Sequence, residues 1–113
     1  MRKMISVYIT RQKDGCIRQV RVKGHAGFAG KGSDIVCAAA SVTAYTAAGA
    51  LEELAGIKDC YSVKDGYMLI NIPEGIRDEQ LLTAKVILET TAIGFKQIEM
   101  EYGDYIKVFD EEV

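Results

Sequence analysis

The chain has 113 residues, of which 49% are hydrophobic and 27% are charged, and its formal net charge is −2. This length and composition predict a single soluble globular domain over residues 1–113. A small negative net charge provides no basic field to hold nucleic acid, so we expect no direct nucleic-acid binding. The same charge mildly favours a basic protein as partner.

Export and membrane insertion are not expected. The positively charged start of segment 1–10 is followed by alternating apolar and polar residues, which is not the pattern of a signal peptide. The uncharged run 35–51 approaches the length of a membrane span, but its Ala, Ser, Thr and Gly residues favour a helix packed inside the protein. Three widely spaced cysteines, Cys16, Cys37 and Cys60, argue against a disulfide framework and favour a reducing, cytoplasmic location.

Two β-hairpins are predicted in the first two thirds of the chain, each closed by a Lys-Asp-Gly turn. Stretches with alternating or β-branched residues flank these turns, over residues 5–10, 16–23, 60–63 and 67–72. Between the hairpins the pattern predicts a helix over residues 34–54, with Gly56 as its C-cap.

The last third predicts a second helix and a further hairpin. Apolar residues recur at helical spacing over residues 78–95, which indicates an amphipathic helix. Residues 97–102 and 105–109 flank Gly103-Asp104 and predict a third hairpin. The resulting order, ββαββαββ, favours an α+β fold in which two helices cover a largely antiparallel or mixed sheet.

Residues 24–41 contain the residues best suited to chemistry. They include the only histidine, His25, and one of the three cysteines, Cys37. If the helix begins at Ser33 or Asp34, Cys37 lies in or just beyond its first turn, where unpaired N–H groups and the helix dipole favour a thiolate. This arrangement predicts a Cys-His pair with Cys37 as nucleophile and His25 as general base.

Two residues of the helix are candidates to support this pair. Asp34 is suited to cap the helix, and alternatively to orient His25. Ser41 follows Cys37 by four residues and therefore lies on the same helical face, where its hydroxyl can bond the thiol or the imidazole. Its alternative role is a bond to the carbonyl of its own helix one turn earlier.

The glycines before the helix predict a mobile substrate loop. Gly27, Gly30 and Gly32 together exceed what one tight turn needs, and they suit a segment that opens for an extended peptide. Phe28 lies within this segment and is expected to contact substrate or to plug the site.

The motif Gly-His-Ala at 24–26, followed by Gly-x-Asp-Ile-Val-Cys-Ala-Ala-x-Ser at 32–41, resembles the signature of the ribosomal-processing cysteine protease family, Prp. The resemblance implies a small enzyme that removes the N-terminal extension of large-subunit ribosomal protein twenty-seven during ribosome maturation. It also implies a homodimer, and cleavage between an aromatic residue and a small one. Neither the residues nor the resemblance points to a cofactor.

Two other functions fit the same residues, and structural zinc is a third alternative. The loop and helix suit a non-catalytic binding module for ribosome assembly, and a reactive Cys37 also suits a thiol redox sensor. Structural zinc would require Cys16, His25, Cys37 and Cys60, which lack the short paired spacings of known zinc sites, so we expect no metal.

Overall fold

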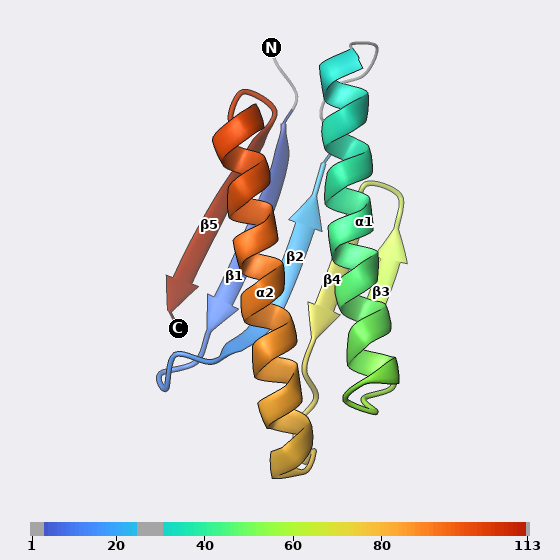
Figure 1. Cartoon of the computed structure of the whole chain (residues 1–113), viewed down its shortest axis with the longest axis vertical. Helices are drawn as coiled ribbons and strands as arrows, with labels where there is room; N and C mark the ends of the chain where they lie inside the picture. The colour runs from blue at the N-terminus through green and yellow to red at the C-terminus, as the bar shows by residue number, and fades with distance from the viewer. Residues whose placement is uncertain (1–3, 25–30, 113) are drawn as a thin grey trace.

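The fold is a mixed five-stranded sheet with two long helices, as given by a computed structural model in which residues 4–24 and 31–112 are described. Within these residues the elements follow the order ββαββαβ (Figure 1). Their bounds are β1 Ile5–Arg11, β2 Ile17–Lys23, α1 Lys31–Glu53, β3 Tyr61–Lys64, β4 Tyr67–Asn71, α2 Asp78–Tyr102 and β5 Ile106–Glu112. The predicted α+β class is confirmed.

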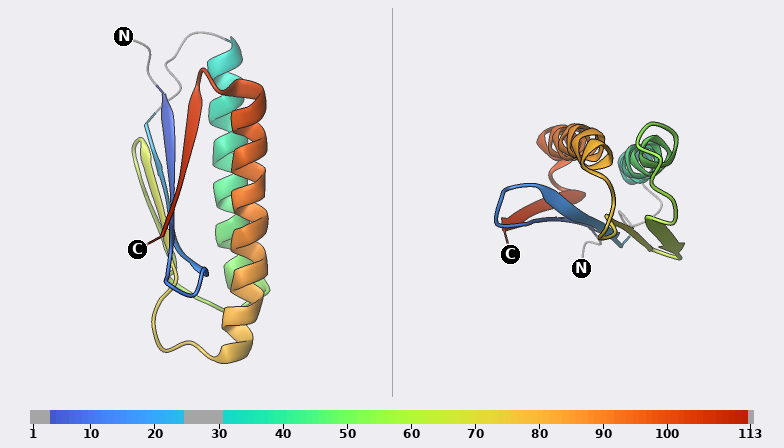
Figure 2. Two further views of the ribbon diagram at one scale, coloured as in Figure 1. Left: turned by 90° about the vertical axis from the view of Figure 1, so that its left-hand side faces the viewer. Right: turned by 90° about the horizontal axis from the view of Figure 1, so that it is seen from below.

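The strands lie in the order β3-β4-β2-β1-β5. All neighbouring pairs are antiparallel except β1 and β5, which are parallel. Both helices cover the same face of this sheet, and they lie side by side (Figure 2). The sheet therefore has one face buried under helices and one face without them.

Both predicted Lys-Asp-Gly hairpins are confirmed. Gly15 and Gly66 close the β1–β2 and β3–β4 turns with φ values of +89° and +70°, a region that L-residues with side chains rarely adopt. In the first turn the Asp14 carboxylate also accepts a hydrogen bond from the Cys16 N–H at 2.9 Å. These turns are determined by local sequence, which is why the pattern predicts them.

Helix α1 contributes mainly small side chains to the core, and its close neighbour is helix α2. Its buried apolar residues recur at helical spacing and are Val36, Ala40, Ala44, Ala47, Ala48 and Leu51. Residues 35–53 are long and apolar enough to cross a membrane by length and composition alone, but their inward face forms part of the core. One such helix is weak support for a membrane span, because core helices have the same composition.

The end of α1 is fixed as predicted. Gly56 adopts a φ of +67° and donates its N–H to the Glu52 carbonyl at 3.1 Å, while the Ile57 N–H bonds the Leu51 carbonyl at 3.0 Å. The bond from Gly56 to Glu52 is that of the αL helix end, in which glycine takes the left-handed position after the last turn.

The predicted third hairpin is wrong. Helix α2 continues through residues 97–102, and only the following stretch forms a strand, β5. Ile98 and Tyr102 pack against the core and so extend the apolar stripe of the helix. The Glu99 carboxylate accepts the Val108 N–H at 2.8 Å, which fixes the end of α2 to β5.

An ionic cluster ties α2 to the sheet. The Arg11 guanidinium donates to Glu89 of α2 at 2.6 and 3.1 Å and to Asp110 of β5 at 2.7 and 3.1 Å. Lys96 of α2 bonds the same Asp110 carboxylate at 2.7 Å. The hydrogen bonds from Arg11, followed by that from Lys96, hold the pKa of Asp110 at about 2.

Candidate active site

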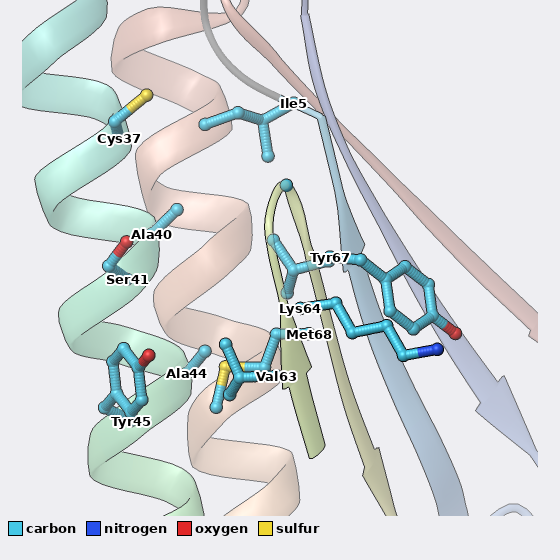
Figure 3. Close-up of a pocket in the computed structure, with 12 residues that line it drawn as sticks. Ile5, Cys37, Ala40, Ser41, Ala44, Tyr45, Val63, Lys64, Tyr67 and Met68 are labelled. Atoms are coloured by element: carbon cyan, nitrogen blue, oxygen red, sulfur yellow. The ribbon is translucent and has the colours of Figure 1, made fainter. Parts of the chain in front are cut away.

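Cys37 of α1 lies beside a cavity of about 150 Å³ between the helix and the sheet (Figure 3). Its side chain is half-buried, and its sulfur points toward the sheet. The cavity is lined by three parts of the fold: α1, the paired strands β1 and β2, and the β3–β4 hairpin. The nucleophile predicted from sequence therefore has space in front of it for a substrate group.

The wall of this cavity is largely apolar. Ala44 of α1 and Val63 and Met68 of the hairpin contribute aliphatic and thioether surface, and Tyr45 closes the end away from Cys37 (Figure 3). Cys37 and Tyr45 are eight residues apart, which corresponds to roughly 12 Å along a helix axis. The cavity therefore follows α1 for about two turns, a shape suited to a short extended peptide with an apolar side chain.

Ser41 lines the same cavity as Cys37. The predicted shared helical face is thus confirmed, because residues four apart lie one above the other on an α-helix. The Ser41 side chain is exposed, so its hydroxyl is accessible to a group that enters the cavity.

The start of α1 differs from the prediction. The helix begins at Lys31 rather than at Ser33 or Asp34, so Cys37 is its seventh residue and lies beyond the first turn. A seventh residue has a carbonyl four residues earlier for its N–H, and the dipole effect falls off within the first turn. The predicted benefit of the helix start to Cys37 is therefore smaller than the sequence pattern suggested.

The earlier start of α1 also changes the predicted roles of two residues. Asp34 is the fourth residue of α1 and is not its N-cap, and Gly32 belongs to the helix rather than to a loop. Lysine is a good helix former, which favours a helix that starts at position 31, before Ser33. Orientation of His25 by Asp34 stays a prediction.

His25, Gly27, Phe28 and Gly30 lie outside the described residues. Their predicted roles as general base and substrate loop therefore stay predictions.

Gly24, the residue before His25, is described and has a role that the sequence pattern did not reveal. It has a φ of +90°, and a Cβ at this position would lie 2.7 Å from the Met4 carbonyl oxygen, so only glycine fits. Its N–H donates to the Gly66 carbonyl at 2.8 Å, and Gly66 lines the cavity. Gly24, the last described residue before His25, is thus held beside a residue of the cavity wall.

The other two cysteines lie apart from this site. Cys60 is 3% exposed, its thiol is directed at the Ile57 carbonyl, and burial raises its pKa. Cys60 is therefore a core residue of the fold. Cys16 is half-buried and lines a separate cavity beside Leu81 and Ala84. Within residues 4–24 and 31–112, no group of three or more His, Cys, Asp or Glu side chains is arranged to hold a metal ion.

Comparison with known proteins supports a protease. The family model described as cysteine protease Prp matches residues 4–107. The ribosomal processing cysteine protease Prp of Bacillus subtilis (strain 168) is 31% identical over 107 residues, which cover 93% of this chain and 96% of that protein. Its namesake from Staphylococcus aureus (strain Mu50 / ATCC 700699) is 32% identical over 107 residues, which cover 93% and 97%.

Solved structures agree with this relationship. The crystal structure of an essential ribosomal processing protease Prp from S. aureus with a substrate peptide has a TM-score of 0.82 and 29% identity, covering 96% of this chain and 100% of that one. The same protease with a covalently linked product peptide has a TM-score of 0.80 and 31% identity, with the same coverage. Because the family model spans nearly the whole chain and the fold agrees, this chain belongs to the cysteine protease Prp family.

Proposed function

We propose that this protein is a ribosomal processing protease that removes the N-terminal extension of large-subunit ribosomal protein twenty-seven. The observation that carries the proposal is the position of Cys37, at one end of a cavity that the fold leaves open between α1 and the sheet. The relatives in B. subtilis and S. aureus, which are named ribosomal processing proteases, support the choice of substrate.

In the proposed mechanism, Cys37 and His25 act as a nucleophile and base pair. The Cys37 thiolate attacks the scissile carbonyl carbon, and the imidazolium of His25 gives its proton to the leaving amine as the peptide bond breaks. This step leaves a thioester between Cys37 and the new carboxyl-terminal residue. Water, deprotonated by His25, then attacks the thioester, and the thiolate leaves as the product acid is released.

The cavity provides the proposed specificity. Cleavage by this family after an aromatic residue requires a pocket for a ring next to the nucleophile, and the wall formed by Ala44, Val63 and Met68 is apolar. An apolar cavity of similar volume in another protein binds benzene, so one ring fits in a space of this size. The aromatic side chain is therefore expected to bury here while its carbonyl faces Cys37.

The exposed outer surface of the two helices is the proposed homodimer interface. Several large apolar side chains on this surface are more than half exposed, including Val42 at 64%, Val86 at 66% and Ile93 at 57%. A groove of about 400 Å³ runs between Val42 of α1 and Val86 of α2. Val86→Lys is expected to shift the protein from dimer to monomer in sedimentation velocity, and an unchanged sedimentation coefficient would contradict this interface.

The central test is cleavage of the ribosomal protein that carries its N-terminal extension, followed by intact mass under reducing conditions. We expect one defined cut with the wild-type protein and at least about a 10³-fold lower rate with Cys37→Ala, because loss of a nucleophile removes the covalent pathway. Cys16→Ala is the matched control, and it should cleave at the wild-type rate. Stable binding of the substrate without a cut would favour the binding-module hypothesis instead.

A further inference from the structure

The sheet face opposite the helices presents a set of aromatic and basic side chains. Strand register places Tyr8 of β1 beside Arg21 of β2 on one side and beside Phe109 of β5 on the other. The buried neighbours Val7 and Ile9 point toward the helices, so the alternation of a strand directs Tyr8 to the opposite face. Within the described residues no helix or strand covers this face (Figure 2).

The aromatic residues of this face form a stack that ends at the edge of the sheet. The rings of Tyr8 and Phe109 are stacked, with centroids 5.1 Å apart and planes inclined by 16°. The Arg21 guanidinium carbon lies 4.8 Å from the Tyr8 ring centroid. Because β5 is the edge strand and Phe109 is 42% exposed, the side of this stack away from Tyr8 is accessible to another planar group.

Basic side chains surround the stack. Lys23 follows Arg21 by two residues, and its ammonium lies 5.9 Å from the Tyr8 ring centroid. Lys107 precedes Phe109 by two residues and is exposed on the same face. Glu111 is the only acidic residue at the outward positions of the described strands. This face is therefore locally positive, although the whole chain carries a net charge of −2.

One donor of this face lacks a partner within the fold. The Nε of Arg21 is buried and has no hydrogen-bond partner among the described residues. The guanidinium lies over the Tyr8 ring, and this stacking contact sets the orientation of its other N–H groups. Because Nε is buried, an anion that approaches from outside the sheet would pair with the terminal N–H groups of this half-buried arginine.

We propose that this uncovered sheet face binds single-stranded RNA. Unpaired bases stack on exposed aromatic rings, while lysine and arginine side chains pair with the phosphates between them. A duplex cannot use the ring stack in this way because its bases already stack on each other. The choice of RNA over DNA rests on the proposed function, since ribosomal proteins assemble with RNA.

The proposed RNA face is separate from the proposed catalytic site. Cys37 and its cavity lie between α1 and the helix-covered face, whereas Tyr8, Arg21 and Phe109 lie on the other side of the sheet. The net charge of the chain led to the expectation of no nucleic-acid binding, but a sum over the chain does not describe how charge is distributed over two faces. RNA binding here would hold the enzyme near its substrate without contacting the scissile bond.

The test measures fluorescence anisotropy of a labelled twelve-nucleotide single-stranded RNA with the full-length wild-type protein at two salt concentrations. Arg21→Gln combined with Lys107→Gln should weaken binding at least about tenfold at low salt and make the slope of log K against log salt shallower by about 1.4, the value for two lost phosphate contacts. Lys58→Gln combined with Lys85→Gln removes the same charge from exposed positions elsewhere and should leave binding unchanged. Phe109→Leu keeps apolar volume but removes the ring, and should weaken binding by about 5- to 100-fold.

Three results would overturn the proposal. They are absence of binding by the wild-type protein at low salt, equal weakening by both double variants, and equal affinity for duplex RNA or polyphosphate of matched charge. Thermal unfolding confirms that each variant is folded before its affinity is compared. Cleavage of the free ribosomal protein by the Arg21, Lys107 and Phe109 variants should remain at the wild-type rate. If neither the wild type nor any variant cleaves the ribosomal protein while the wild type still binds RNA, the proposed substrate is refuted and the proposed RNA face is not.

Discussion

Helices α1 and α2 lie side by side on one face of the sheet, but they contact it in different ways. Helix α1 has no charged residue from Ile35 to Leu51 and packs through small side chains that leave a cavity in front of Cys37. Helix α2 packs through larger groups such as Leu88 and Phe95 and adds ion pairs to strands β1 and β5.

The two helices therefore have different roles: α1 forms the pocket, and α2 stabilises the sheet. Small side chains on α1 let its backbone approach α2 and fill the space toward the sheet incompletely, which a substrate pocket requires. Large side chains and ionic contacts on α2 stabilise the sheet that forms the opposite wall of that pocket. Substitutions on α1 should therefore change activity more than stability, and substitutions at α2 contacts should do the reverse.

The largest expected effect on stability comes from Phe95→Ala. Phe95 is fully buried, and loss of its ring leaves a cavity that should lower the free energy of unfolding by about 3–5 kcal/mol. Urea denaturation followed by circular dichroism measures this change. The folded fraction of the variant should keep a near-normal kcat/KM at low temperature, and loss of activity in a fully folded variant would contradict the division of tasks.

Arg11→Met should have a smaller effect. The change removes hydrogen bonds to Glu89 and Asp110 but keeps most of the aliphatic volume, so we expect the free energy of unfolding to fall by about 1–3 kcal/mol. Lys85→Met, at an exposed position of α2, is the matched control and should change stability by less than about 0.5 kcal/mol. Equal stability of the two variants would show that the cluster contributes nothing to the fold.

The pH dependence of stability should reveal the same cluster. The folded-state pKa of Asp110 is about 2 against its ordinary value of 3.8, because Arg11 and Lys96 favour the charged carboxylate. A lowered folded pKa contributes stability that is complete above about pH 4 and is lost as the pH falls toward the folded value. The difference in urea midpoint between wild type and Asp110→Asn should therefore shrink from pH 6 to pH 2, and a constant difference would argue against this coupling.

Local signals predicted the parts of the fold that depend on neighbouring residues. The two Lys-Asp-Gly turns and the Gly56 cap follow from glycine at left-handed positions, which sequence displays directly. The third hairpin was predicted wrongly because Ile98 and Met100 alternate with polar residues as in a strand. Ile98 and Tyr102, four residues apart, also fit a helical stripe, and packing against the core decides in favour of α2.

Long-range contacts set the limits of prediction at the site as well. The shared face of Cys37 and Ser41 follows from helical spacing, and the structure confirms it. The close approach of Gly24 to Met4 and the contribution of the β3–β4 hairpin to the cavity depend on strand pairing between distant segments. No local pattern contains that pairing, nor the parallel pairing of β1 with β5.

The smallest expected effect is that of Ser41→Ala on α1. The Ser41 hydroxyl is exposed in the cavity one turn from Cys37, so its loss should lower kcat/KM for the ribosomal substrate by about 3- to 10-fold through one weakened hydrogen bond. Stability should change by less than about 0.5 kcal/mol, because an alanine on an exposed helical surface is well tolerated.

The matched control for this variant lies on α2. Thr83 donates its hydroxyl to the Glu79 carbonyl of its own helix at 3.2 Å and has no place in the cavity, so Thr83→Val should leave kcat/KM unchanged. If both variants lose activity equally, the hydroxyl at position 41 has no specific role, and Ser41 acts only as a helix residue. If only Ser41→Ala loses activity while its unfolding curve matches that of wild type, α1 carries a polar contribution to catalysis beyond Cys37.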